Sequence, residues 1–320
     1  MDKQFISDLK TGDTVHSEFV ATEKTLIAFN QPNRAGEQFL RMQLADRSGT
    51  IRAVAWDKGP ELAGRFEIGD VLRVRGEVGH YRGPQLVVSG LEPVPPEEVQ
   101  RQFFQRVAPR EREDMLGELR HILTEITQPH LAELMKSFFE DKEFFRLYSE
   151  APAARSVHHN YVGGLLEHSL EVAALCYRFA RSYHELDQSL LLCGALMHDM
   201  GKIEEYDTKS LTFEMTTRGK LIGHIVIGKE MLDERVRQIP GFPAELQMEL
   251  SHLILSHHGQ KEWGSPEVPR TFAAFALHHA DLVSARLNQF AQVAGKGSKP
   301  DGWTDYDRLL ERDVYLGLAE

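Results

Sequence analysis

Histidines and aspartates recur at inward-facing positions on successive helices expected in the second half of the chain. Each shares an apolar stripe at helical spacing with leucine or isoleucine, or follows a segment that is apolar on nearly all sides. In chain order they are His168, His198, Asp199, His224, His257, His258 and Asp281. One buried histidine is usually a hydrogen-bonded core residue, and one buried aspartate needs only an ionic partner. Their joint occurrence instead favours a shared site for divalent cations.

Imidazole nitrogens and carboxylate oxygens are ligands of Zn, Mn, Fe, Co and Ni, and the sequence has no competing thiolate motif. His198 and Asp199 project a little over a quarter turn apart at a helix end, so both can reach one metal while Asp199 bridges to another. The number of ligands favours two metals. The first is expected on His168, His198, Asp199 and Asp281, and the second on Asp199, His224 and His257 or His258.

Two metals that share a ligand can activate hydroxide and stabilise the charge on a phosphoryl group. The predicted chemistry is therefore hydrolysis of phosphate esters by a metal-activated hydroxide, with Asp199 as the catalytic bridging ligand. Gly201 is expected to end the helix that carries His198. The partial negative charge of a helix C-terminus favours a cation beside it.

The spacing of apolar residues predicts the elements that position these residues, and this spacing changes along the chain. From about residue 15 to 94, apolar and polar residues alternate in five or so short runs separated by turn formers, which predicts a small barrel or sandwich. The prolines of residues 93–96 end this region. Helical spacing then continues to about residue 289. A glycine-rich loop follows, and residues 306–318 are expected to form a short closing helix.

Composition bounds the class of protein. A chain of 320 residues with 42% hydrophobic and 27% charged residues is typical of a soluble globular protein with two or three domains. The longest apolar runs reach only about eight residues, so no membrane helix is expected. Residues 1–5 have no basic segment that leads into an apolar stretch, so no secretory leader is expected. Two cysteines imply no disulfide framework. The expected location is the cytoplasm, and the net charge of −11 disfavours binding of nucleic acid by overall charge.

The ordered ligand set resembles the HD superfamily of metal-dependent phosphohydrolases. The matching positions are His168, the His198-Asp199 pair and Asp281, with His224 and His257-His258 similar to the extra ligands of its dinuclear members. Lys202 resembles the lysine that faces substrate phosphate in such proteins, which implies a catalytic and substrate-binding role. One position departs from the family: Ser284 stands where a second acidic residue often follows the last motif aspartate by three positions.

A strand-rich first domain before such a helical domain resembles the YhaM-type 3′ to 5′ exoribonucleases of bacteria. The resemblance covers nearly the whole chain, including residues 158–168, 219–224, 255–259 and the tail from residue 302. It implies hydrolysis of single-stranded RNA from the 3′ end to nucleoside 5′-monophosphates, with single-stranded DNA left open as a further substrate. It also implies two divalent ions, Mn²⁺ first, with Fe, Co, Ni, Zn or Mg as alternatives. A homo-oligomer is left open, and no membrane partner is expected.

The expected architecture is a multidomain chain with an all-β OB-fold barrel followed by an all-α helical bundle. We expect the OB-fold nucleic-acid-binding domain at residues 1–95 and a helical linker region that packs on the HD domain at 96–150. The HD phosphohydrolase domain is expected at 151–295, and a C-terminal tail at 296–320.

Further residues are expected to contact RNA. Charge-assisted contacts to phosphate position a strand without reading its bases. By their proximity in sequence to the ligands, the candidates for this role are Arg155, His159, Lys202, Arg218 and Lys220. An OB-fold binds single strands through stacking and basic side chains on one face. The candidates on the barrel are Phe39, Arg41, Trp56, Arg75, Tyr81 and Arg82. Two alternatives stay open: His159 could instead orient a metal ligand, and Phe39 and Trp56 suit a core position equally well.

Three other functions fit the same residues. An HD phosphohydrolase could act on mononucleotides or cyclic dinucleotides, with the barrel as a regulatory module. An HD protein with a dinuclear iron site could be an oxygenase, which predicts O₂ uptake and no ester cleavage. A non-catalytic RNA-binding protein could use the metals structurally. The full ligand set argues against the non-catalytic protein, and the resemblance over nearly the whole chain favours the exonuclease.

Overall fold

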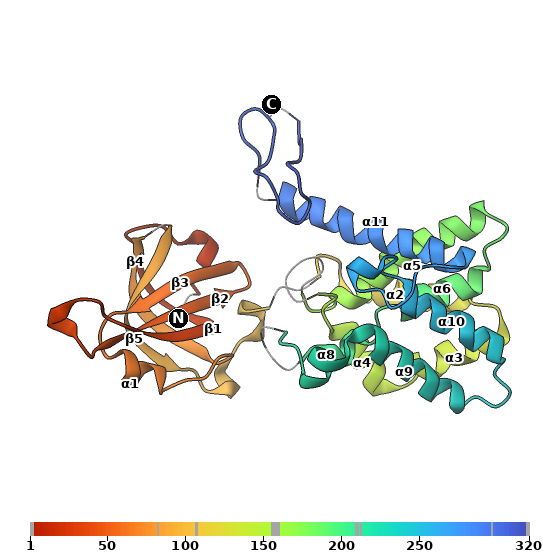
Figure 1. Cartoon of the computed structure of the whole chain (residues 1–320), viewed down its shortest axis with the longest axis horizontal. Coiled ribbons are helices and arrows are strands. Elements are labelled where there is room, and N and C mark those ends of the chain that lie inside the picture. Colours follow the sequence, from red (N-terminus) through yellow and green to blue (C-terminus); the bar gives the residue numbers. More distant parts are fainter. Residues whose placement is uncertain are drawn as a thin grey trace. The chain divides into compact units, whose positions relative to one another are not determined.

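A computed structural model of the chain describes residues 3–81, 83–105, 108–154, 161–208, 211, 213–295 and 297–317. The chain forms two units, shown in Figure 1. The first comprises residues 1–107 together with 209–213, and the second comprises residues 108–208 and 214–320.

The first unit is a closed five-stranded barrel, which confirms the predicted OB-fold. Its strands are β1 (Thr14–Ala28), β2 (Gln38–Asp46), β3 (Gly49–Ala55), β4 (Val71–His80) and β5 (Pro84–Pro93). Their order around the barrel is β1-β2-β3-β5-β4, and only β3 and β5 pair in parallel. The short helix α1 (Gly59–Ala63) and the 3₁₀ turns η1 (Ile6–Asp8), η2 (Pro32–Arg34), η3 (Pro96–Glu98) and η4 (Arg101–Phe103) complete the unit.

The alternating pattern of the strands sets the inner and outer faces of the barrel. On β2, Leu40, Met42 and Leu44 are buried in the barrel core, and Arg41 between them is exposed. A small second cluster of Val20, Val71, Val94 and Phe104 lies outside this core. Leu211, which is far along the chain, packs against that cluster.

The second unit is all-helical apart from its loops and isolated bridges, as predicted. Its α-helices are α2 (Arg112–Glu125), α3 (Pro129–Phe139), α4 (Lys142–Glu150), α5 (Gly164–Ser182), α6 (Gln188–Met197), α7 (Lys202–Glu205), α8 (Thr217–Ile222), α9 (His224–Arg237), α10 (Ala244–Ser256) and α11 (Phe272–Ala294), with a 3₁₀ turn η5 (Lys261–Trp263) before the last. No helix in the described part of the chain is long and apolar enough to cross a membrane.

Helix α6 lies at the centre of this unit, and its apolar sequence explains why. Residues 189–197 are all buried, and the helix packs against α3, α5, α10 and α11. Asp187 begins the helix by accepting the Leu190 N–H at 2.8 Å. His198 follows its last turn directly. The buried core helix therefore delivers His198 and Asp199 to the middle of the unit.

The closing helix expected at 306–318 is wrong for the described residues up to 317. They form turns and two isolated bridges, Trp303 to Tyr315 and Asp307 to Arg312. The Asp307 carboxylate accepts the N–H groups of Leu309 and Leu310, each at 3.0 Å. Such local bonds offer the backbone an alternative to a helix.

Candidate metal centre

Five helices of the second unit, labelled in Figure 1, carry or adjoin the seven ligand candidates. They lie near the start of α5, directly after α6, at the first residue of α9, directly after α10 and in the middle of α11. Two groups form, within each of which one ligand atom per residue lies within 4.8 Å of the others. The first group is His168, His198 and Asp281, and the second is His224, His257 and His258.

Asp199 lies between the two groups with one oxygen toward each. Its Oδ2 is 3.7 Å from His168 Nε2 and 3.4 Å from His198 Nε2. Its Oδ1 is 3.4 Å from His224 Nε2 and 3.6 Å from His257 Nε2. This geometry suits a carboxylate that bridges two cations.

Hydrogen bonds at Nδ1 orient three of the imidazoles. His198 Nδ1 lies 2.9 Å from the Ala195 carbonyl, and His257 Nδ1 lies 2.7 Å from the Ile254 carbonyl. His224 Nδ1 lies 3.1 Å from Glu205 Oε1. In the neutral ring, an N–H that donates at Nδ1 leaves the lone pair on Nε2, which faces Asp199. The rings are therefore held ready to bind a metal.

Three buried acceptor atoms, two from the second group and one from Asp199, support the interpretation that a metal binds here. Asp199 Oδ1, His224 Nε2 and His257 Nε2 are buried and have no hydrogen-bond partner among the described residues. Leaving buried polar atoms unsatisfied is costly, and three of them face one another here. A divalent cation would satisfy all three, and imidazole with carboxylate is a suitable donor set for it. The residues therefore fit a metal.

The electrostatics of the cluster also favour a bound cation. Burial lowers the pKa of His168 and of His257, and it lowers the pKa of His258 to about 3. Burial alone would raise the pKa of Asp199, but Lys202 and His198 hold it well below its usual value. Burial opposes charge on His198 as well, yet Asp199 and Asp281 raise its pKa. Ionised carboxylates thus stand among mostly neutral rings.

A cavity of about 460 Å³ opens onto both groups. Lys202 on α7 lines it and is only 7% exposed, with Nζ 2.5 Å from Asp199 Oδ2. Other lining residues are Tyr206, Trp263, His278, Arg286 and Gln289. A phosphate in this cavity would meet the Lys202 ammonium beside the ligands.

Two residues that support the second group could not be identified from the sequence. Glu205 is buried, and its Oε1 accepts the backbone N–H of His224 at 2.9 Å as well as facing the ring. His278 Nδ1 lies 2.7 Å from the His257 carbonyl. Gly259 makes room for that ring, because a Cβ there would lie 2.2 Å from His278 Cε1. Both contacts join distant segments, so only the fold reveals them.

The structure places the predicted phosphate contacts differently. Arg218 on α8 pairs with Glu204 and Glu230. Neither Arg218 nor Lys220 is among the described residues that line the cavity. Arg155 and His159 lie outside the described residues. Lys202 is thus the one predicted phosphate contact that the described structure brings to the ligands.

On the barrel, Phe39 and Trp56 face each other where β2 begins and β3 ends. Their ring centroids are 4.8 Å apart, and Trp56 is 42% exposed. Phe29, which the sequence did not single out, joins them with its centroid 5.1 Å from that of Phe39. We call Phe29, Phe39 and Trp56 the aromatic cluster.

The basic candidates on the barrel divide between two of its sides. Arg41 is exposed next to Phe39 along the outer face of β2. Arg52 on β3 donates to the carbonyl of Tyr81 at 3.3 Å, which links the exposed Tyr81 to the same side. Arg75 lies on β4, which β1 separates from β2 and β5 separates from β3. Arg82 lies outside the described residues.

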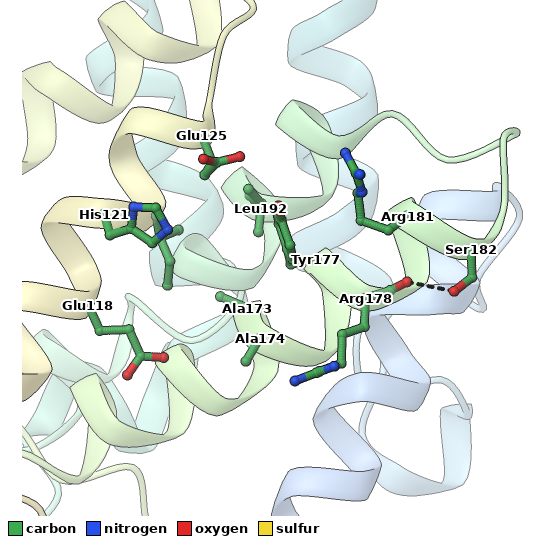
Figure 2. A pocket seen from close by; sticks show the side chains of 11 residues that line it. Glu118, His121, Glu125, Ala173, Ala174, Tyr177, Arg178, Arg181, Ser182 and Leu192 are labelled. Carbon is green, nitrogen blue, oxygen red and sulfur yellow. Dashed lines mark hydrogen bonds between the residues drawn. The ribbon is translucent and has the colours of Figure 1, made fainter.

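A larger cavity, of about 590 Å³, lies between α2 and α5 and is distinct from the ligand cluster. Figure 2 shows Glu118, His121 and Glu125 from α2 on one side and Arg178 and Arg181 from α5 on the other. In the part of the chain that the structure describes, no three ligand atoms are close enough there to share a metal. Cavity size therefore does not identify the reactive site.

Comparison with known families agrees with both units. A family model described as HD domain matches residues 165–286, and one described as OB-fold nucleic acid binding domain matches residues 22–94. A third model, of a helicase family, matches residues 102–187. The HD match includes every one of the seven ligand candidates.

Curated relatives match most of the chain. The 3′-5′ exoribonuclease YhaM of Bacillus subtilis is 32% identical over 278 residues, covering 86% of this chain and 87% of the relative. YhaM of Bacillus velezensis is 32% identical over 305 residues and covers 94% of each chain. With this identity over nearly the full length of both chains, the protein belongs to the YhaM family of HD-domain 3′-5′ exoribonucleases.

Proposed function

We propose that this protein degrades single-stranded RNA from its 3′ end, with divalent metal ions, and releases nucleoside 5′-monophosphates. The observation that carries the proposal is the placement of Asp199, with one oxygen toward each group of histidines. Curated relatives that carry the name 3′-5′ exoribonuclease support the substrate and the direction.

The residues of the metal centre have two roles, which are to hold the ions and to bind the phosphate. The first group would hold one ion with Asp199, and the second group would hold another. Two divalent ions, for which Mn²⁺ is the first choice, would activate water and stabilise the charge on the phosphoryl oxygens. The Lys202 ammonium would bind a phosphoryl oxygen and so orient the scissile bond beside the ligands. Its contact with Asp199 fixes its position before substrate arrives.

The barrel supplies a surface for a single strand. Exposed aromatic rings can stack on bases of any sequence, and arginines can contact the phosphates between them. The aromatic cluster with Arg41 offers both on one face of β2 and β3. We propose that this face holds the strand upstream of its 3′ end. The cytoplasm, where RNA is abundant, is the proposed site of action.

The test is a time course with 5′-labelled single-stranded RNA beside DNA of the same sequence, in Mn²⁺ or in EDTA. We expect a ladder that shortens from the 3′ end and nucleoside 5′-monophosphates as products. EDTA and Asp199→Ala should abolish both. Asp114→Ala, at an exposed position on α2, is the matched control and should leave the rate unchanged.

The alternatives give different results in the same assay. RNA that stays intact with every metal tried, together with cleavage of mononucleotides or cyclic dinucleotides, would replace the exoribonuclease by a small-nucleotide phosphohydrolase. Degradation of DNA at an equal rate would widen the substrate to any single strand. Full activity of Asp199→Ala would contradict the dinuclear centre.

A further inference from the structure

Ser284 lies on α11, three positions after the ligand candidate Asp281. Its side chain is buried in α11, with the residue only 3% exposed. Its Oγ lies 2.9 Å from Nδ1 of His168 and donates a hydrogen bond to Glu171 Oε2 at 2.6 Å. A hydroxyl on α11 thus connects a ligand candidate on α5 to a carboxylate on that same helix.

Helix α11 contacts the His168 ring at both of its nitrogens. Asp281 and Ser284 are three residues apart and share one face of α11. Asp281 Oδ1 lies 3.1 Å from Nε2 of the ring, and Ser284 contacts Nδ1. His168 and Glu171 are likewise three residues apart on α5. The contacts therefore form a closed chain from α5 to α11 and back.

The donor and the acceptor in each of these hydrogen bonds follow from the chemistry of the groups. An ionised carboxylate only accepts, so the Ser284 hydroxyl gives its single hydrogen to Glu171. The lone pairs of Oγ then accept the Nδ1–H of His168. In the neutral ring this leaves a lone pair on Nε2, which faces Asp281, Asp199 and His198.

We propose that Ser284 and Glu171 are positioning residues that fix the tautomer and orientation of His168 for a divalent cation. The Glu171 carboxylate on α5 acts on the ring through the Ser284 hydroxyl on α11. The inference rests on the metal centre of the proposed function, but not on the identity of its substrate.

Mn²⁺ binding to the full-length protein tests the proposal without any activity assay. Two ions should give two binding steps in the isotherm of wild type. The step that is lost in His168→Ala belongs to the first group. Ser284→Ala should weaken that step by roughly 10- to 100-fold, as loss of a partner behind a ligand usually does. The other step should be unchanged. Ser284→Thr keeps the hydroxyl and should keep the affinity.

Two further variants separate this role from general damage to the fold. Glu171→Gln still accepts a hydrogen bond but has no charge, so it should weaken the same step less than Ser284→Ala does. Glu205→Gln acts behind His224 and should weaken only the other step. Urea unfolding in EDTA checks that each variant is folded.

The proposal is overturned for Ser284 if Ser284→Ala leaves the His168-dependent step unchanged, and for Glu171 if Glu171→Gln leaves it unchanged. It is also overturned if wild type shows no such step. Two-step Mn²⁺ binding in a protein that leaves RNA intact would refute the proposed substrate alone. Normal RNA degradation with no effect of Ser284→Ala on Mn²⁺ binding would refute the positioning role alone.

Discussion

At the scale of single residues, Asp199 turns one carboxylate oxygen toward each group of histidines, so a substitution can affect both groups. Asn keeps the shape, but it is neutral and replaces one acceptor by an N–H₂ donor that cannot bind a metal. We expect Asp199→Asn to lose both steps of Mn²⁺ binding and to leave the buried Lys202 without its counter-ion. Asp281→Asn should lose only the step that depends on His168. Metal content after dialysis distinguishes the two variants, and two bound ions in Asp199→Asn would refute the bridge.

The two cysteines give a second prediction at this scale. Cys176 and Cys193 are fully buried in α5 and α6, and burial raises the pKa of both thiols. Only the thiolate reacts readily. Ellman's reagent at pH 8 should therefore label the native protein very slowly and label two thiols per chain in denaturant. Rapid labelling of the folded protein would show that α6 opens frequently.

Residue types and helical spacing were enough to predict all seven ligand candidates, because each lies on an apolar stripe or at the end of an apolar helix. The groups behind them could not be predicted. Glu205 and His278 meet their partners across 19 and 21 residues of chain, through contacts that depend on how helices pack. Among the predicted phosphate contacts, Arg218 pairs with two glutamates on the surface, and its contact with phosphate stays a prediction.

At the scale of elements, the approach of α7 to α9 depends on a glycine. A Cβ on Gly201 would lie 2.0 Å from the carbonyl oxygen of His224 and 2.7 Å from the Gly228 nitrogen. These are backbone atoms of the first turns of α9, which cannot move aside alone. Gly201→Ala should therefore displace His224 and weaken the Mn²⁺-binding step that belongs to the second group. It should also destabilise the fold by roughly 1–3 kcal/mol.

Gly117 provides the matched control for that substitution. It lies inside α2, and a Cβ there would meet no atom within 4 Å. Gly117→Ala should stabilise the protein by about 0.5–1 kcal/mol, because alanine loses less entropy in a helix. Urea unfolding of both variants measures the difference. Equal stability of the two would contradict the close approach of Gly201.

Periodicity predicted the elements well where a core enforces it. The barrel strands and the helices of the second unit each bury one face or all faces, so their patterns are strong. The tail after α11 buries little, and there its local side-chain bonds decide the conformation. Of the described tail residues, Leu310 and Val314 join Val293 of α11 in a small cluster. A helical pattern over 306–318 was therefore misleading.

At the scale of the whole molecule, binding and hydrolysis are assigned to different units, so they can be separated. Trp56→Ala removes the most exposed ring of the aromatic cluster. Stacking on one base contributes about 1–3 kcal/mol, so affinity for a long single strand should fall by roughly 5- to 150-fold. The turnover rate at saturating RNA should stay unchanged.

Trp303 is the control for this prediction, since it is similarly exposed but belongs to the tail of the second unit. Trp303→Ala should leave RNA affinity within twofold of wild type. Affinity measured by fluorescence anisotropy in EDTA avoids degradation of the probe. If Trp56→Ala lowered turnover but not affinity, the barrel face would not be the strand-binding surface.

The packing of Leu211 against the small cluster of the barrel has a consequence for how the chain is made. Phe104 completes the contiguous part of that cluster, but Leu211 leaves the ribosome about a hundred residues later. At synthesis rates of about 5–20 residues per second, this delay is roughly 5–20 s. The small cluster of the nascent barrel therefore stays without Leu211 while α2 to α7 are still being translated, which leaves an apolar patch exposed. A translational pause within that interval would lengthen the exposure, and chaperone capture of the arrested chain should report it.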